Sequence, residues 1–496
     1  MNFKKKKKFF TYICTVILSV SVLIQASFPV LAEPEEPVNE AQQAAQERLL
    51  LPIKTNELSY WPKGPAITAQ SAILMEADTG TILYAKNIHE ELYPASTTKM
   101  LTCLIAVEQC ALNETVNFTY EAVSAVPTDG SNMGMDAGEY ISMEECLYGI
   151  MVASANEVAN AVAEHVAGSL DGFAEMMNQR AAELGCQNTH FVNANGLHAD
   201  DHYTSAYDLA LIARAYFQND VLRRIGNTPS YHFTPSAGQS DDFYKTNKHK
   251  LINGELSYEG VIGGKTGYTD PAGQTLVTGC EQAGMRLICV VMKEDAPAQF
   301  EDTVTLFDYG YQNFTRANIA DNDTRHIINN SNFFYTGKDI FGDSSPILSI
   351  ASDGYVVLPN MSTFADLTPE IDYEAAGLQK NEVARIDYYY HDTLIGSGKI
   401  VFSSQNTHTY DFSSDDEPVT GRPDNVIFIN IKMLLLIISS IAAVTIFVLI
   451  LHSVFYNRQD FRHGRQRKKQ YRRDQRLKRK ERRLAKRSRK RRRRRR

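Results

Sequence analysis

The pattern of apolar and polar positions predicts β-strands near both ends of one long folded segment. Two apolar runs, Ser71–Ala77 and Thr81–Asn87, flank Asp78-Thr79-Gly80, an arrangement that is typical of a β-hairpin. Much later in the chain, apolar and β-branched residues return in runs that are bounded by turn residues. These runs predict three further strands, at residues 260–268, 274–280 and 285–292.

Between the two groups of strands, the apolar positions follow helical spacing. A helix is predicted over Ser96–Gln109, and a mostly helical, alanine-rich region over 143–217 is interrupted by an Asn/Gly/His loop at 193–202. Strands that flank a helical insert are most simply assembled into one antiparallel sheet with helices packed on its faces. The sequence therefore predicts an α+β fold.

The segments on either side of this unit have different patterns. Residues 33–57 are rich in Glu, Gln, Ala and Pro, which predicts a linker that can hold a short helix, and ordered structure is expected to begin near Ile67. Residues 317–412 contain short, alternating β-branched and aromatic segments between turns. This second pattern predicts a separate small β domain.

Long apolar runs near the two ends indicate where the chain resides. The first, Phe9–Ile24, follows five lysines and leads to Val30-Leu31-Ala32, which is typical of a cleaved secretory signal; an uncleaved anchoring helix is the alternative. The second, Met433–Leu451, has 19 residues without a charge and would span about 28 Å, enough for a bilayer core. A buried soluble helix is the alternative, but this run has no polar face.

The charges are distributed unevenly along the chain. Its formal net charge is -6, yet residues 457–496 hold 24 of the 52 Lys and Arg. Without this tail and Lys4–Lys8, 23 basic residues stand against 55 acidic ones, which argues against nucleic-acid binding by the exported part. The basic tail is predicted to lie on the cytoplasmic side of the membrane and to contact anionic lipid, while a contact of the tail with nucleic acid or the ribosome stays open.

Six cysteines remain in the exported part, since Cys14 leaves with the signal. They allow either disulfides or buried free thiols. No Cys-x-x-Cys pair is present, so neither a metal site nor another cofactor is expected. The six are Cys103, Cys110, Cys146, Cys186, Cys280 and Cys289.

The segment Pro94-Ala95-Ser96-Thr97-Thr98-Lys99 carries the strongest chemical signal. If Ser96 opens a helix, Lys99 lies one turn further on the same face, within reach of the serine hydroxyl. Desolvation and nearby positive charge would let such a lysine lose its proton and act as a base. Taken alone, the segment is better explained as an ordinary N-cap serine followed by a solvated lysine.

Two further motifs give Ser96 and Lys99 a chemical context. Ser154-Ala155-Asn156 lies between them and Lys265-Thr266-Gly267, which is the only Lys-Thr-Gly in the chain. The order S-x-x-K, S-x-N, K-T-G is the signature of penicillin-binding proteins and serine β-lactamases. With their flanking residues, these stretches resemble the low-molecular-mass penicillin-binding proteins that are serine-type D-alanyl-D-alanine carboxypeptidases.

The resemblance implies roles for four residues. Ser96 would attack the penultimate D-alanine carbonyl of a peptidoglycan stem peptide, and Lys99 would take its proton. Ser154 would relay a proton to the leaving amine, and Asn156 would bind both Lys99 and the substrate amide.

The same resemblance assigns substrate contacts to the third motif. Lys265 and Thr266 would hold the terminal carboxylate, while Gly263, Gly264 and Gly267 would leave room for the substrate backbone. The oxyanion would be bound by the backbone N–H groups of Ser96 and of the residue after Gly267, Tyr268.

Some positions depart from the family or carry weaker signals. The family has His or Tyr at the position of Tyr268, so no catalytic role is assigned to that side chain, and Ala298-Gln299 stands where many members have a basic residue. His198 and His202 could suggest a metal site, but their irregular loop makes zinc improbable. Glu157 could be a hydrolytic base, although it is expected to face solvent or a neighbouring base.

The resemblance also implies a domain plan, in which a β-lactamase/DD-peptidase-like catalytic domain is followed by a β-rich domain and one C-terminal transmembrane helix. The segments are a signal peptide (1–32), a linker (33–66), the catalytic domain (67–316), the β-rich domain with its linker (317–425), the transmembrane helix (426–456) and a cytoplasmic tail (457–496).

The sequence thus predicts a single-pass membrane enzyme with an extracytoplasmic catalytic domain, which removes D-alanine from stem pentapeptides and is inhibited by β-lactams. A β-lactamase is a weaker alternative, because the chain lacks the E-x-x-L-N element that carries the deacylating glutamate of one large class. A catalytically silent wall-binding module and a cross-link endopeptidase also stay open, since motifs alone do not separate them.

Overall fold

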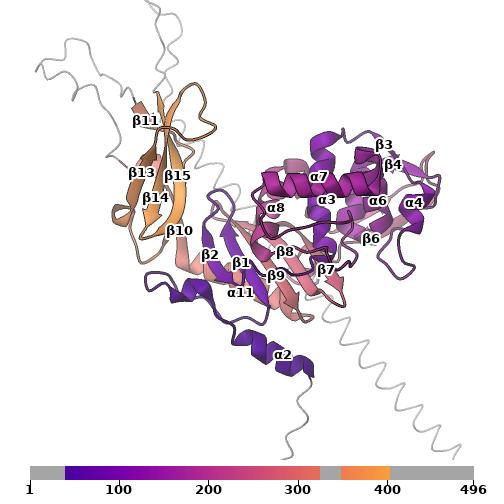
Figure 1. Ribbon diagram of the computed structural model, residues 1–496, viewed down its shortest axis with the longest axis horizontal. Helices are drawn as coiled ribbons and strands as arrows, with labels where there is room; N and C mark the ends of the chain where they lie inside the picture. Colours follow the sequence, from indigo (N-terminus) through magenta and orange to yellow (C-terminus); the bar gives the residue numbers. More distant parts are fainter. Residues whose placement is uncertain (1–39, 324–347, 403–496) are drawn as a thin grey trace, which may run out of the picture. The chain divides into compact units, whose positions relative to one another are not determined.

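A computed structural model describes residues 40–323 and 348–402 of the protein (Figure 1). The predicted signal (1–32), transmembrane helix (426–456) and basic tail (457–496) lie outside these ranges. Among the residues that are described, no helix is both long enough and apolar enough to cross a membrane.

A five-stranded antiparallel sheet lies between helices in the main domain (Figure 1). Its strand order is β2-β1-β9-β8-β7, so strands from both sides of the helical insert meet where β1 pairs with β9, and β7 lies at one edge. The predicted sheet is confirmed. Its strands are β1 (Ser71–Glu76), β2 (Ile82–Lys86), β7 (Val261–Thr269), β8 (Gly273–Gln282) and β9 (Met285–Glu294).

Strand β1 is buried along its whole length because both faces of the sheet are covered. Ile73 and Met75 belong to one apolar core, whereas Ala72 and Leu74 belong to the other. This division follows from the alternation of side chains along a strand.

The helical insert covers one face of the sheet, where Leu209 packs in the same core as Ile288 of β9. Helix α11 (Ala298–Asn313) covers the other face, and its Phe307 shares a core with Leu74. The insert contains the 3-10 helix η2 (Ala95–Thr98), α3 (Lys99–Gln109), α4 (Tyr120–Ser124), α5 (Met143–Tyr148), the π-helix η3 (Gly149–Ala153), α6 (Asn156–Ala167), α7 (Leu170–Glu183), α8 (Ala206–Gln218) and α9 (Asp220–Gly226).

Smaller elements complete this domain. They are the strand pairs β3 (Thr115–Asn117) with β4 (Tyr140–Ser142) and β5 (Ser230–Phe233) with β6 (Phe243–Thr246), and the short helix α10 (Lys250–Asn253).

A second antiparallel sheet follows α11, in the order β10-β12-β15-β14-β13, with β11 paired to β15. Its first strand begins at Phe314, before the predicted domain boundary at residue 317, because Phe314 packs against Trp61 and Tyr309. The elements are β10 (Phe314–Asn318), α12 (Ile319–Asn322), β11 (Leu348–Ile350), β12 (Tyr355–Pro359), the 3-10 helix η5 (Phe364–Asp366), β13 (Thr368–Asp372), β14 (Glu382–Tyr390) and β15 (Thr393–Phe402).

The expectation that ordered structure begins near Ile67 is wrong. Helix α2 (Glu40–Leu49) and the 3-10 helix η1 (Lys54–Glu57) precede that residue. Trp61 is 2% exposed, and its indole Nε1–H donates to the carbonyl of Leu83, 2.9 Å away. A few anchoring side chains fix this segment, although its overall composition resembles that of a linker.

The buried Lys86 side chain ties the N-terminal segment to the sheet. Its ammonium group donates to the carbonyls of Arg48 (2.8 Å) and Ile67 (2.7 Å). Burial lowers the pKa of Lys86 to about 8, although nearby Asp302 and Glu294 oppose this shift. The Arg48 side chain in turn donates to the carbonyl of Thr68, 2.8 Å away.

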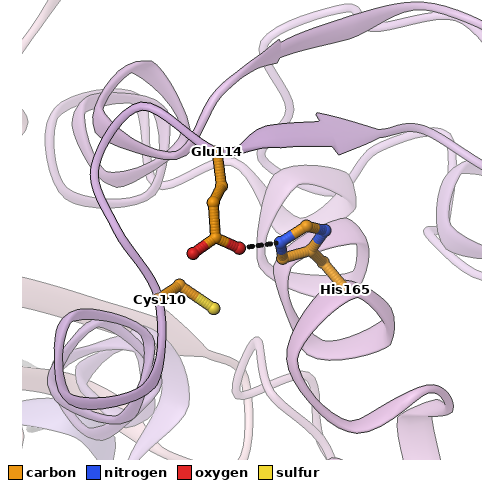
Figure 2. A group of neighbouring side chains, drawn as sticks. All are labelled: Cys110, Glu114 and His165. Atoms are coloured by element: carbon orange, nitrogen blue, oxygen red, sulfur yellow. Dashed lines mark hydrogen bonds and ion pairs between the residues drawn. The ribbon is translucent and has the colours of Figure 1, made fainter.

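All six cysteines of the described residues are free thiols. Cys103, Cys146, Cys280 and Cys289 are buried, as small apolar side chains are in many cores. Cys110 is only partly buried and lies beside Glu114 and His165 (Figure 2).

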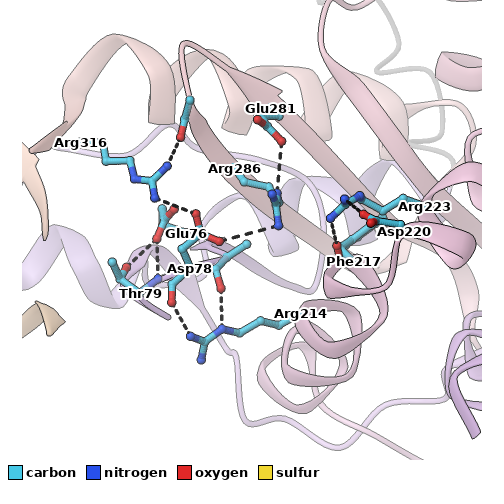
Figure 3. Close-up of polar contacts among 12 residues, drawn as sticks. Glu76, Asp78, Thr79, Arg214, Phe217, Asp220, Arg223, Glu281, Arg286 and Arg316 are labelled. Carbon is cyan, nitrogen blue, oxygen red and sulfur yellow. Dashed lines mark hydrogen bonds and ion pairs between the residues drawn. The ribbon is translucent and has the colours of Figure 1, made fainter. Parts of the chain in front are cut away.

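Arginines from three elements hold the β1–β2 turn (Figure 3). The Asp78 carboxylate pairs with Arg316 of β10 at 3.1 Å and with Arg286 of β9 at 3.7 Å. From α8, Arg214 donates to the backbone carbonyls of Ala77 and Asp78. The predicted hairpin is therefore bound both to helix α8 and to strand β10 of the second sheet.

We expect Trp61→Ala to destabilise the protein by about 3 to 5 kcal/mol, because it leaves a cavity and removes the indole hydrogen bond to the Leu83 carbonyl. Tyr120→Ala is the matched control, since Tyr120 is 79% exposed and its loss should change stability by less than about 0.5 kcal/mol. Urea unfolding of both variants measures the difference. Equal stability of the two would contradict the inclusion of the N-terminal segment in the core.

Candidate active site

Ser96 lies where the chain turns into the helical insert, as predicted. Ala95–Thr98 form a 3-10 turn that runs directly into α3, whose first residue is Lys99. The Nζ atom of Lys99 lies 3.0 Å from the Oγ atom of Ser96. The three-residue spacing therefore places an amine against a hydroxyl that is itself partly exposed.

The Lys99 side chain is fully buried and is surrounded by hydrogen-bond acceptors and positive charge. It donates to Oδ1 of Asn156 at 2.7 Å and to the backbone carbonyl of Asn195. Desolvation, and then the charges of Lys265 and Lys248, hold its pKa well below the ordinary lysine value.

This arrangement suits a neutral amine. Neutral Lys99 has two N–H bonds and one lone pair. Asn156 and the Asn195 carbonyl accept the two N–H bonds, so the lone pair is left for the hydroxyl hydrogen of Ser96. The geometry is that of a base poised to deprotonate a nucleophile.

The second motif lies at the junction between η3 and α6. Ser154 has a left-handed backbone conformation (φ 61°), and Asn156 is the first residue of α6. This sharp turn lets the two side chains contact different lysines: Ser154 contacts Lys265, and Asn156 contacts Lys99. A non-glycine residue in this conformation costs of order 1 to 3 kcal/mol, which is typical of functional sites.

Lys265 extends from edge strand β7 into the same buried region. Its Nζ atom donates to Oγ of Ser154 and to the Thr266 carbonyl, each at 2.9 Å. Burial, and then the charge of Lys248, lower its pKa to about 7. Lys265 can therefore change its charge at a pH near neutrality.

Gly267 allows β7 to approach the nucleophile. A Cβ atom at this position would lie 2.9 Å from the Pro94 carbonyl oxygen and 3.1 Å from the backbone nitrogen of Ser96. On the opposite side, a Cβ on Gly196 would lie 1.9 Å from the Ala95 carbonyl oxygen. The backbone around Ser96 is thus held between two glycines.

Gly263 and Gly264 have a packing role within the protein. A Cβ on Gly264 would meet the Val277 carbonyl at 2.4 Å and the His249 ring at 2.8 Å, and one on Gly263 would meet Phe217 at 3.3 Å. Protein atoms therefore lie close to the positions that Cβ atoms would take on these two glycines.

A cleft of about 530 Å³ opens over Ser96, in the size range of ligand sites. Tyr268 lines it, and its phenol is 58% exposed and donates to Asp270 at 2.8 Å. The predicted residues on its wall are Ser96, Ser154, Asn156, Thr266, Gly267 and Tyr268.

Sequence reasoning missed three polar groups of the site. Lys248 lines the cleft and donates to Oγ of Ser131 at 2.6 Å, and the Asn195 carbonyl contacts Lys99. Lys248 has no motif around it that could have singled it out. Asn195 lies in the Asn/Gly/His loop, but its contribution is a backbone atom, which side-chain patterns do not reveal.

Gln299 belongs to the pair Ala298-Gln299, where the resemblance led us to expect a departure from a basic residue. Its side chain lines the cleft and donates to Oε1 of Gln274 at 3.2 Å. Gln274 and Gln299 therefore present amide groups to the cleft.

His202, which was a weaker candidate for a metal ligand, makes contacts within the protein. His202 is buried, its Nε2 lies 2.9 Å from Oγ1 of Thr98, and its Nδ1 accepts from the Val192 N–H. Burial lowers its pKa to about 3, and both ring nitrogens are engaged within the protein.

The expectation that Glu157 faces solvent is wrong. This carboxylate is 2% exposed and accepts from the backbone N–H groups of Met133 (2.6 Å) and Gly134 (3.1 Å). It thereby holds the loop that leads to Ser131, on the wall of the cleft.

A serine, two buried lysines and an asparagine around one cleft define a serine acyl-transfer site. The family model described as D-alanyl-D-alanine carboxypeptidase, peptidase S11, matches residues 59–296. This chain belongs to that family. The family and the enzyme class predicted from the three motifs, a serine-type carboxypeptidase, are therefore confirmed.

Individual relatives support the assignment. DacF of Bacillus subtilis is 34% identical over 267 residues, which cover 53% of this chain and 65% of DacF. DacB2 of Mycobacterium tuberculosis is 32% identical over 265 residues, covering 52% of this chain and 87% of DacB2. The crystal structure of penicillin binding protein 6B from Escherichia coli matches with a TM-score of 0.52 and 26% identity, over 69% of this chain and 98% of that one.

We expect Gly267→Ala to slow acylation of the nucleophile by a fluorescent penicillin at least tenfold, because the added methyl group pushes β7 away from Ser96. Overpacking should also cost about 1 to 3 kcal/mol of stability.

Gly279→Ala on β8 is the matched control. Its Cβ would lie 2.8 Å from Phe217, far from the nucleophile in the fold, so it should cost similar stability but leave acylation nearly unchanged. Equal acylation rates of the two variants would contradict the proposed role of the Gly267 contact.

Proposed function

We propose that this enzyme removes the terminal D-alanine from peptidoglycan stem pentapeptides, with Ser96 as nucleophile and Lys99 as base. The Ser96 hydroxyl gives its proton to Lys99 while its oxygen forms a bond to the penultimate D-alanine carbonyl carbon. The observation that carries the proposal is the 3.0 Å approach of a buried, neutral-favouring Lys99 to Ser96.

The tetrahedral oxyanion needs donors, and two backbone N–H groups are proposed to supply them. They belong to Ser96 and Tyr268, and the close contact of Gly267 with the Ser96 nitrogen brings their two segments together. A single donor of this kind typically contributes about 3 to 4 kcal/mol to transition-state stabilisation.

Collapse of the intermediate breaks the peptide C–N bond and requires a proton on the leaving amine. Ser154 is proposed to deliver it and to recover one from Lys265, to which it is hydrogen-bonded at 2.9 Å. Free D-alanine departs, Lys99 loses the proton that it took from Ser96, and Lys265 regains one, both by exchange with solvent. A water molecule then attacks the acyl carbonyl carbon while giving a proton to neutral Lys99, which passes it to the Ser96 oxygen as the shortened peptide is released.

Positive charge in the cleft suits the substrate's terminal carboxylate. We assign Lys265 and Thr266 to this contact, and Lys248 adds a charge on the same cleft. Asn156 is proposed to hold both Lys99 and the amide of the bound peptide, since its Oδ1 faces Lys99 and its residue lines the cleft.

The location of the enzyme is also a proposal. The apolar run Met433–Leu451 and the basic residues after it support a single membrane-spanning helix, with the tail in contact with anionic lipid inside the cell. The leader 1–32 supports export of the catalytic domain to the outer face of the membrane.

Purified full-length protein should form a long-lived adduct with penicillin at Ser96 and release D-alanine from a pentapeptide ending in D-Ala-D-Ala. Ser96→Ala should abolish both, and peptide mass spectrometry locates the modified residue. Rapid turnover of penicillin would favour a β-lactamase. An absence of D-alanine release, with equal peptide binding by Ser96→Ala, would favour a silent wall-binding module.

We expect single-turnover acylation to rise with pH through the pKa of Lys99, because only the neutral amine accepts the serine proton. Lys248→Ala removes a positive charge that lowers this pKa, so the rise of the acylation rate with pH should move to higher pH. Lys245→Ala is the control and should not change the pH at which the acylation rate rises. A pH-independent rate, or an equal shift in both variants, would contradict Lys99 as the base.

A further inference from the structure

A second group of reactive side chains lies away from the cleft (Figure 2). Ligand atoms of Cys110, Glu114 and His165 all lie within 4.8 Å of one another, and Nε2 of His165 is 3.0 Å from Oε2 of Glu114. It is the single group of three or more His, Cys, Asp or Glu residues in the described ranges that is close enough to share a metal ion.

We propose that Cys110, Glu114 and His165 bind a divalent transition-metal ion, with Zn²⁺ as the expected occupant. Four tetrahedral ligands at about 2.0 to 2.3 Å from Zn²⁺ lie roughly 3.3 to 3.6 Å apart. Small side-chain rotations would therefore convert the present hydrogen bond into coordination, and the thiol would give its proton to solvent.

The types of ligand favour zinc over the hard cations. Thiolate and imidazole are preferred by Zn²⁺, whereas Ca²⁺ and Mg²⁺ are bound mainly by oxygen ligands. Three protein ligands leave a fourth position for water. That position is accessible, since the side chains of His165 and Glu114 are 23% and 42% exposed.

The backbone already orients the proposed ligands. Cys110 caps α3, and its N–H donates to the Ala106 carbonyl at 2.9 Å. The Ala111 N–H donates to Oε1 of Glu114 at 2.6 Å and so fixes the carboxylate, as outer contacts do in metal sites. His165 lies in the last turn of α6.

The group links the far ends of the two helices that hold the catalytic amine. Lys99 is the first residue of α3 and Asn156 the first of α6, and Cys110 and His165 lie at the opposite ends. At 1.5 Å per residue, the two sites are about 14 to 17 Å apart along the two helices. A metal here would clamp both helices and take no part in the reaction.

Metal titration of the full-length protein in detergent, after removal of bound metal by a chelator, tests the proposal. Zn²⁺ should bind at one tight site, and Co²⁺ should give a thiolate charge-transfer band. Cys110→Ser and His165→Gln should each weaken Zn²⁺ binding at least tenfold, and Cys110→Ser should remove the band. Cys186→Ser, which changes another partly buried free thiol, should leave both unchanged.

Alkylation of the wild-type protein provides a measurement that does not depend on variants. Zn²⁺ should protect Cys110 from iodoacetamide and leave the rate at Cys186 unaltered, as peptide mass spectrometry can determine. Equal alkylation of Cys110 with and without Zn²⁺, an absent Co²⁺ band, or wild-type affinity in both ligand variants would overturn the metal site. D-alanine release is independent of each of these outcomes.

Discussion

The site depends on keeping one amine out of water. Lys99 is fully buried at the start of the helical insert, and two further lysines, Lys265 and Lys248, add positive charge to its surroundings. Both effects disfavour the ammonium form, so that the amine next to Ser96 can accept a proton. Carbonyl acceptors on Asn156 and Asn195 fix the direction of the lone pair. Solvation of Lys99 would remove the base without moving the nucleophile.

The fold brings three distant stretches of chain to this amine. The 3-10 helix η2 before α3 supplies Ser96, the junction of η3 with α6 supplies Ser154, and strand β7 supplies Lys265. Because β1 and β9 pair at the centre of the sheet, the strands before and after the helical insert belong to the same sheet as β7. Close backbone contacts at Gly196 and Gly267 then set the position of Ser96. Packing of the main chain therefore determines the geometry of the chemistry.

Local patterns predicted much of this arrangement. The hairpin, the antiparallel sheet and the helix after Ser96 follow from hydrophobic periodicity and turn residues, and the three motifs carried a resemblance that the family match confirms. Contacts between distant residues could not be predicted in the same way. The Asn195 carbonyl is a backbone atom, and Lys248 has no motif around it. Single anchors such as Trp61 determine whether an N-terminal segment of linker-like composition packs into the core.

The position of β7 at the edge of the sheet has a consequence for selectivity. Within the described residues, its outer backbone groups have no neighbouring strand to bind, so an extended peptide can add alongside it. Main-chain hydrogen bonds are the same whatever side chains the peptide carries. A peptide bound in this way can carry different side chains in its middle residues. The enzyme then recognises its substrate mainly by the terminal residues. One enzyme could therefore process stem peptides that differ in their middle residues.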